Sequence, residues 1–252
     1  MALTFENEGR ILAKITDGKL KNKNVSVVGN VADAVKTFNT LTLKDGSFQH
    51  MPDPETERQI LYITGPSGSG KSTYTANYAL LYKQVFKKNP IYVFSALKDD
   101  ESLDVIKPKR FKITKEALLD DKLNIEDLKN SLCIFDDIDC ISDKELKNEV
   151  YNILNAILET GRHFKISCII TNHLPSNGPY TRRILNECHT VTYFPHSGNN
   201  GKISKFLIEQ IGISKKDYIL NKKAKSRWAT IFKNYPMVNM TQNNIRLLDT
   251  ED

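Results

Sequence analysis

The segment that most constrains this chain is the glycine-rich stretch GPSGSGKST at residues 65–73. Residues 65–72 match the pattern G-x-x-x-x-G-K-[ST]; the apolar run QILYIT precedes them, and the helix-like run KSTYTANYALLYKQVF begins at their end. Glycines let the backbone curl until successive N–H groups face one anion, and the start of the helix adds a partial positive charge. A strand, this loop and a helix therefore predict a site for the phosphates of a nucleoside triphosphate.

The residue types of the loop indicate how the phosphates and a metal ion are held. Lys71 is expected to reach the β- and γ-phosphates, and the hydroxyl of Ser72 is expected to ligate Mg²⁺. A glycine-rich turn before an ordinary helix would not need the complete pattern. The predicted nucleotide-binding residues are Gly65, Pro66, Ser67, Gly68, Ser69, Gly70, Lys71, Ser72 and Thr73.

Two adjacent acids follow a second apolar run, in LCIFDD at residues 132–137. A carboxylate at the C-terminal end of a buried parallel strand lies at the same edge of the sheet as the phosphate loop. We expect Asp136 to hold the hydration shell of Mg²⁺, and Asp137 to orient or deprotonate the attacking water. An acidic surface turn is the alternative interpretation.

A third apolar run begins at Ile166 and ends in the polar residue Asn172. Its amide is expected to hydrogen-bond the γ-phosphate or the attacking water and so to report hydrolysis. Thr171 or His173 could share that position, and a turn residue that only ends the strand is the alternative.

The transition state of phosphoryl transfer also needs positive charge, and ATPases of this kind usually take an arginine from a neighbouring subunit. Arg183 and Arg162 are the first candidates for this role, and Arg182 and Arg227 are further ones. A DNA contact or a surface ion pair would explain each of them equally well.

Strand and helix patterns alternate from residue 58 onward, which predicts an α/β fold. Buried parallel strands read as continuous apolar runs, and the five runs here are QILYITG, PIYVFSA, SLCIFDD, KISCIITN and HTVTYFP. Ser142 and Glu145 form a capping box for a helix that stops at Gly161. The expected fold is a P-loop NTPase of the additional-strand type, with a mainly parallel five-stranded core sheet, helices on both faces and short β elements at both termini.

The two ends of the chain differ from the middle. Residues 1–57 contain short β patterns and two hairpin signals, Asp17-Gly18 and Asp45-Gly46, before the proline-containing stretch MPDPETER. The expected domains are a β-rich extension at 1–57, an ATPase core at 58–200, and a helical and β extension packed on the core at 201–252.

Charge and composition exclude several classes of protein. No run approaches the roughly 18 apolar residues of a membrane span, and no signal peptide is recognised, so a cytoplasmic location is expected. The spacing of the four cysteines is typical of neither zinc nor disulfides. The net charge of +6 is concentrated in KLKNKN at 19–24, KPKRFK at 107–112 and KKAKSR at 222–227. Such clusters can bind phosphate backbones, although lysine-rich surfaces are also common.

These segments resemble the poxvirus-type genome-packaging ATPases of large DNA viruses, in the FtsK–HerA superfamily. The resemblance covers residues 58–240 and rests on GPSGSGKST, CIFDDID, GRHFKISCIITNHL, TRRILNECHTVTYFP and KSRWATIFKNYP. It implies a homo-oligomeric ring that hydrolyses ATP with Mg²⁺ and moves double-stranded DNA of any sequence into a capsid. Capsid or vertex proteins are implied as further partners, and the host cytoplasm, virus factory or virion as its place.

The resemblance also implies roles for single residues. Lys71 and Ser72 take the phosphate-loop roles, Asp136 the metal role and Asp137 the role of the catalytic carboxylate. This chain departs from the family twice: many members have glutamine at the position of Asn172, and many have glutamate at the position of Asp137. Both side chains here are one methylene shorter.

Two other classes of function fit the phosphate loop. A loader- or helicase-like ATPase suits Asn172, but it would be expected to end in a helical lid, whereas RWATIFK and MVNMTQN have strand patterns. A nucleotide-dependent switch protein would have no need for Asp137. A transporter ATPase would need an L-S-G-G-Q-like signature, which is missing between residues 71 and 136.

Overall fold

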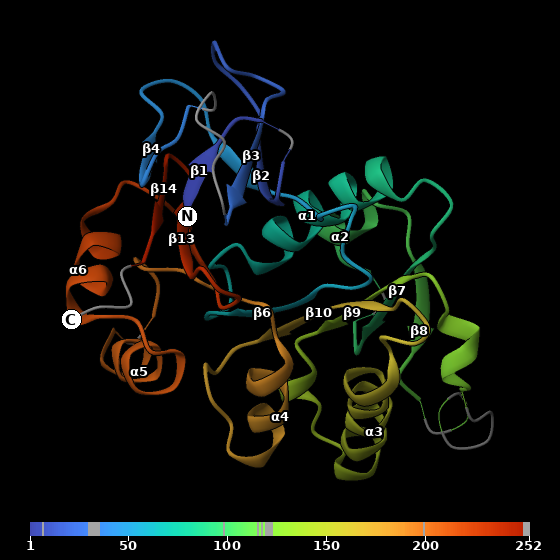
Figure 1. The fold of residues 1–252 in the computed structure, drawn as a ribbon. Helices are drawn as coiled ribbons and strands as arrows, with labels where there is room; N and C mark the ends of the chain where they lie inside the picture. The colour runs from blue at the N-terminus through green and yellow to red at the C-terminus, as the bar shows by residue number, and fades with distance from the viewer. Residues whose placement is uncertain are drawn as a thin grey trace. The chain divides into compact units, whose positions relative to one another are not determined.

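The computed structural model describes residues 1–6, 8–29, 36–97, 99–114, 116, 118, 123–198 and 200–248 (Figure 1). Its internal contacts divide the chain into two compact units. The middle unit is Thr56–His189, and the split unit combines Met1–Glu55 with Thr190–Asp252. No helix in these described ranges is long and apolar enough to cross a membrane.

The middle unit contains a parallel sheet whose strands are ordered β6-β10-β9-β7-β8. Every residue of β6, β9 and β10 is buried, because helices cover both faces of the sheet, and this is why the three strands read as continuous apolar runs. The strands are β6 (Ile60–Thr64), β7 (Ile91–Ser95), β8 (Lys109–Lys112), β9 (Leu132–Asp136) and β10 (Ser167–Asn172).

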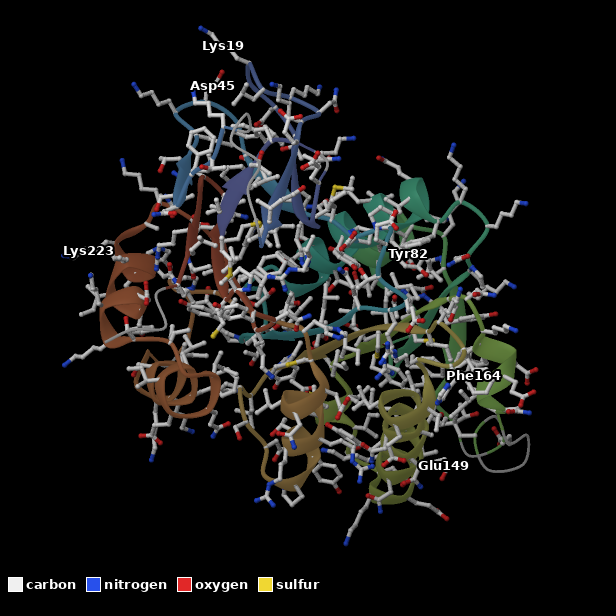
Figure 2. All side chains as sticks on the ribbon, in the orientation of Figure 1. Lys19, Asp45, Tyr82, Glu149, Phe164 and Lys223 are labelled. Atoms are coloured by element: carbon white, nitrogen blue, oxygen red, sulfur yellow. The ribbon has the colours of Figure 1, made fainter. Side chains whose placement is uncertain are left out.

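The helices of the middle unit lie on both faces of this sheet, which confirms the predicted P-loop NTPase-like α/β fold with a mostly parallel sheet. Helices α1 (Lys71–Val85) and α2 (Glu101–Asp104) lie on one face, and α3 (Lys144–Thr160) and α4 (Pro179–Glu187) on the other (Figure 1). Two short 3₁₀ helices are η2 (Ile125–Leu128) and η3 (Ile138–Cys140). Side chains fill the space between sheet and helices (Figure 2). Because the strands are parallel, the phosphate loop after β6 and the ends of β9 and β10 lie at the same edge.

Strand β8 was not expected, because its sequence, KRFK, reads as part of a basic cluster. Its one aromatic residue provides the packing that the charged residues cannot. The ring of Phe111 stacks on Phe94 at 4.7 Å between centroids, and Phe94 stacks on Phe135 at 4.6 Å. The stack runs across β8, β7 and β9 and fixes their register.

The split unit contains two antiparallel arrangements. One has the order β4-β14-β13-β12-β11, and the other has the order β1-β3-β2-β5. The strands are β1 (Ala2–Thr4), β2 (Arg10–Ile15), β3 (Asn24–Val28), β4 (Thr40–Thr42), β5 (Phe48–His50), β11 (Thr190–Tyr193), β12 (Ala229–Phe232), β13 (Val238–Thr241) and β14 (Asn244–Leu247). The helices are α5 (Asn200–Phe206), the π-helix η4 (Leu207–Ile211) and α6 (Lys215–Lys223).

These pairings correct one sequence-based expectation. The run HTVTYFP forms β11, as expected for a strand, and β11 pairs antiparallel with β12. Asp17-Gly18 lies between β2 and β3, which pair with each other as expected for a hairpin. Asp45-Gly46 lies between β4 and β5, but β4 pairs with β14 and β5 pairs with β2. The second dipeptide therefore makes a turn without a hairpin.

The identity of the N-cap residue of α3 can be tested by substitution. The N-cap is Asp143 and not Ser142: the Asp143 carboxylate accepts hydrogen bonds from the backbone N–H groups of Glu145 at 2.9 Å and Leu146 at 3.1 Å. Replacing Asp143 with alanine is expected to lower the free energy of unfolding by about 1 kcal/mol. Ser142→Ala, the matched control, is expected to change it by less than about 0.5 kcal/mol. Urea unfolding followed by circular dichroism measures both, and equal losses would contradict the assignment.

Candidate functional site

The phosphate loop joins β6 to α1 and leaves the start of α1 open. Gly68 and Gly70 have φ of 73° and 108°, which glycine adopts without the penalty that other residues incur. Gly70 is the N-cap of α1 and provides no side-chain hydrogen bond, and the first turn has no acidic residue. The first N–H groups of the helix are therefore available to an anion. The hydroxyl of Ser69 is buried without a hydrogen-bond partner among the described residues, which fits a loop that binds phosphate oxygens.

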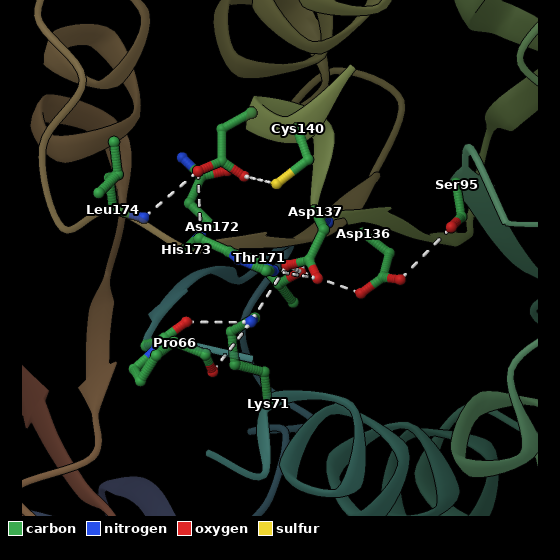
Figure 3. Close-up of polar contacts among 12 residues, drawn as sticks. Pro66, Lys71, Ser95, Asp136, Asp137, Cys140, Thr171, Asn172, His173 and Leu174 are labelled. Carbon is green, nitrogen blue, oxygen red and sulfur yellow. Dashed lines mark hydrogen bonds and ion pairs between the residues drawn. The ribbon is translucent and has the colours of Figure 1, made fainter. Parts of the chain in front are cut away.

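Lys71 lies at the inner end of this loop and is only 5% exposed. Its Nζ donates a hydrogen bond to the carbonyl oxygen of Gly65 at 3.0 Å and lies 3.3 Å from Oδ1 of Asp137 (Figure 3). Ser72 follows it in the first turn of α1 and is half-buried. The predicted phosphate-binding ammonium and the predicted catalytic carboxylate are thus brought together from two different strand ends.

Asp136 ends β9 and is 3% exposed. Its Oδ1 accepts a hydrogen bond from the hydroxyl of Thr171 at 3.0 Å, and its Oδ2 accepts one from the hydroxyl of Ser95 at 3.4 Å. Burial raises the pKa of Asp136, and the adjacent charge of Asp137 raises it further. A cation beside this carboxylate would offset both effects, so the site fits the predicted role in holding hydrated Mg²⁺.

Asp137 follows β9 in the left-handed conformation, with φ 46° and ψ 39°. Aspartate tolerates this region better than most residues. Its backbone N–H donates to Thr171 Oγ1 at 2.8 Å, and that oxygen also lies 3.1 Å from Asp137 Oδ1. The second carboxylate oxygen, Oδ2, lies 2.7 Å from Nε2 of His173. Thr171 and His173 therefore fix both the backbone and the carboxylate of Asp137.

Asn172 is not brought to this acidic pair. Its side chain is fully buried, points away from Lys71 (Figure 3), and its Nδ2 donates to the Tyr62 hydroxyl at 3.4 Å. Side chains alternate along a strand, so Thr171 and His173 face the acidic pair while the residue between them faces the other side. Sequence reasoning had named those two only as alternatives to Asn172.

The two first candidates among the arginines, Arg162 and Arg183, lie in surface ion pairs away from the phosphate loop of their own chain. Nε of Arg162 lies 2.7 Å from Glu57, which precedes β6, whereas the phosphate loop follows β6. Arg183 Nη1 lies 2.7 Å from Glu159, near the end of α3. Neither arginine contributes to the site within one chain.

Known proteins resemble this chain in sequence and in fold. No family model matches the chain. The uncharacterized protein V3 of Sputnik virophage is 44% identical over 248 residues, which is 98% of each chain. The genome packaging NTPase B204 from Sulfolobus turreted icosahedral virus 2, solved with AMPPCP, matches with a TM-score of 0.50 and 12% identity, over 77% of this chain and 98% of B204.

The pCW3 conjugation coupling protein TcpA, solved with ATPγS, matches with a TM-score of 0.50 and 14% identity, over 93% of this chain and 77% of TcpA. Sequence identities of 12% and 14% show only that the fold is shared. The 44% identity to V3, over 98% of each chain, shows that the two proteins belong to one family. The chain therefore belongs to the same family as the uncharacterized protein V3 of Sputnik virophage, and it shares its fold with B204 and TcpA.

Proposed function

We propose that this protein is an ATP-hydrolysing motor that moves double-stranded DNA into a viral capsid. The observation that carries the hydrolytic part is the 3.3 Å contact between Lys71 Nζ and Asp137 Oδ1, at the mouth of an uncapped phosphate loop. Support for the packaging part comes from B204, a genome packaging NTPase solved with an ATP analogue, and from the viral origin of V3.

Each part of the site has a proposed task. Residues 65–73 bind the phosphates of ATP, and Lys71 neutralises their charge. Ser72 and Asp136 are the residues that would hold Mg²⁺. Such sites use few protein ligands, because Mg²⁺ keeps several waters and is also bound by the phosphates of the substrate. Mg²⁺, when bound, supplies charge neutralisation for phosphoryl transfer.

Asp137 is proposed as the carboxylate that takes a proton from the attacking water. The position of β10 between β6 and β9 supports assignment to the additional-strand type of P-loop NTPase. We retain 58–200 as the ATPase core, with extensions at 1–57 and 201–252. All of the loop and acidic residues lie within the middle unit.

A ring would complete the site with an arginine from a neighbouring subunit. Arg162 and Arg183 remain the proposed candidates, since their side chains are 72% and 48% exposed. To act in this way, each arginine would have to leave its glutamate partner and contact the phosphoryl group in the transition state of the neighbouring subunit. A cytoplasmic or virion-associated location and contact with capsid or vertex proteins follow from the same proposal.

Two of the three basic clusters, at residues 107–112 and 222–227, are the proposed DNA contacts. Lys107, Lys109 and Lys112 are exposed in the middle unit. In the split unit, Lys223 extends outward from α6 (Figure 2), and the cluster is completed by Lys225 and Arg227. Contacts of this kind grip phosphates without reading bases, which suits movement along any sequence.

The test is ATP turnover with and without double-stranded DNA. Unrelated DNA sequences are expected to stimulate turnover equally, by several-fold. Changing the six cluster residues to serine is expected to abolish this stimulation and to flatten the salt dependence of DNA binding. The matched control changes Lys19, Lys21 and Lys23, which are also exposed. Turnover that ignores DNA would overturn the packaging function and favour a loader or a switch protein.

A further inference from the structure

The two oxygens of the Asp137 carboxylate have different partners among the residues drawn in Figure 3. Oδ1 lies near Lys71 Nζ at 3.3 Å and near the hydroxyl of Thr171 at 3.1 Å. Oδ2 has a different partner, Nε2 of His173 at 2.7 Å. An ionised carboxylate can only accept, so the imidazole Nε2 is the donor. The short distance is typical of a hydrogen bond to a charged acceptor.

His173 is itself fixed by the turn that follows β9. Its backbone N–H donates to Oδ2 of Asp139 at 3.0 Å, and the N–H of Leu174 donates to the same oxygen at 3.3 Å. The carbonyl oxygen of Asp139 in turn accepts a hydrogen bond from Lys147 Nζ of α3 at 2.6 Å. These hydrogen bonds connect the end of β10 to η3 and α3. They hold the backbone of His173 in place, so its imidazole stays next to Asp137.

Stability of the fold does not explain this pair. The side chains of His173 and Asp137 are 32% and 33% exposed, and pairs this accessible to water contribute little to folding. The exposure instead places the carboxylate where water can reach it. Aspartate has a short side chain, so the direction of its two oxygens is set by the groups that contact them.

We propose that His173 is a positioning residue for hydrolysis, an inference that rests on the proposed role of Asp137. By holding Oδ2, the imidazole fixes the rotation of the carboxylate and keeps Oδ1 turned toward Lys71. Oδ1 is then the oxygen that accepts a proton from the attacking water. Without His173 the carboxylate can rotate, and small misplacements of a catalytic group are costly in rate.

The experiment measures ATP turnover at saturating and limiting ATP. His173→Ala is expected to lower kcat about 10- to 100-fold and to leave KM within about threefold, because ATP binding does not depend on this contact. His173→Gln places an amide N–H near the position of Nε2 and is expected to recover most of the loss. His163→Ala is the matched control, since His163 is exposed in the turn after α3. Circular dichroism confirms that each variant is folded.

A double variant separates positioning from a general structural effect. If His173 acts through Asp137, adding His173→Ala to Asp137→Asn changes the residual turnover by less than about twofold. Wild-type turnover in His173→Ala, or the same loss with and without Asp137, would overturn the inference while leaving the proposed function intact. Wild-type turnover in Asp137→Asn would instead overturn the hydrolytic role of Asp137, and this inference with it.

Discussion

Replacing Asp137 with asparagine is expected to reduce ATP turnover about 10³-fold, with ATP affinity within about threefold of the unchanged protein. Asparagine has the same shape but cannot accept the proton of the attacking water. The loop and Lys71 remain in place, so the phosphates still bind. Single-turnover hydrolysis and titration with a fluorescent ATP analogue measure the two quantities separately.

The matched control for this change is Asp127→Asn, the same chemical substitution at an exposed acid of η2. It is expected to hydrolyse ATP at the unchanged rate. If Asp137→Asn also kept that rate, the proton would have to go to another group. The same measurement on an asparagine variant of Asp136 would then identify it.

Replacing Lys71 with alanine is expected to weaken ATP binding strongly and to reduce turnover. A charge-assisted hydrogen bond is worth about 1.5–3 kcal/mol, so the loss of the contacts of one ammonium with the phosphates weakens ATP affinity by about 100-fold or more. Lys71 is nearly fully buried beside the acidic pair, and its removal also leaves the carboxylates without their nearest cation. Turnover is expected to fall by at least about 10³-fold.

Calorimetric titration of ATP distinguishes this variant from Asp137→Asn, which keeps its affinity. Lys88→Ala is the control, because Lys88 is an exposed lysine in the turn after α1. Unchanged ATP affinity in Lys71→Ala would mean that the loop binds its anion through backbone groups alone.

The phosphate loop and acidic pair could be predicted from the sequence because their signals are local. β6, β7, β9 and β10 were each visible as an apolar run. Strand β8 was not predicted because only one of its residues, Phe111, packs as an aromatic side chain, and the residues beside it are charged. The cap of α3 was misplaced by one residue, since Ser142 and Asp143 are both good N-cap residues and only the backbone decides between them.

The end of β10 shows more clearly which part of the site could not be predicted from the sequence. All six residues of β10 are buried, so no alternation of polar and apolar residues reveals which face each side chain takes. Asn172 was therefore preferred to Thr171 for its chemistry alone. The contact of His173 with Asp137 joins residues far apart in the chain, and no spacing rule marks it. The roles of the site residues remain predictions for the variants above.

The pairing of β4 with β14 has a consequence for how the protein is made. Thr42 leaves the ribosome about 200 residues before its partner Asn244, and the whole middle unit emerges between them. Because domains generally fold as units during synthesis, the unit with the phosphate loop can be complete while β4 still has no β14 to pair with. Translation therefore delivers the phosphate loop and its surrounding sheet first, and β14 emerges later to pair with β4 in the split unit.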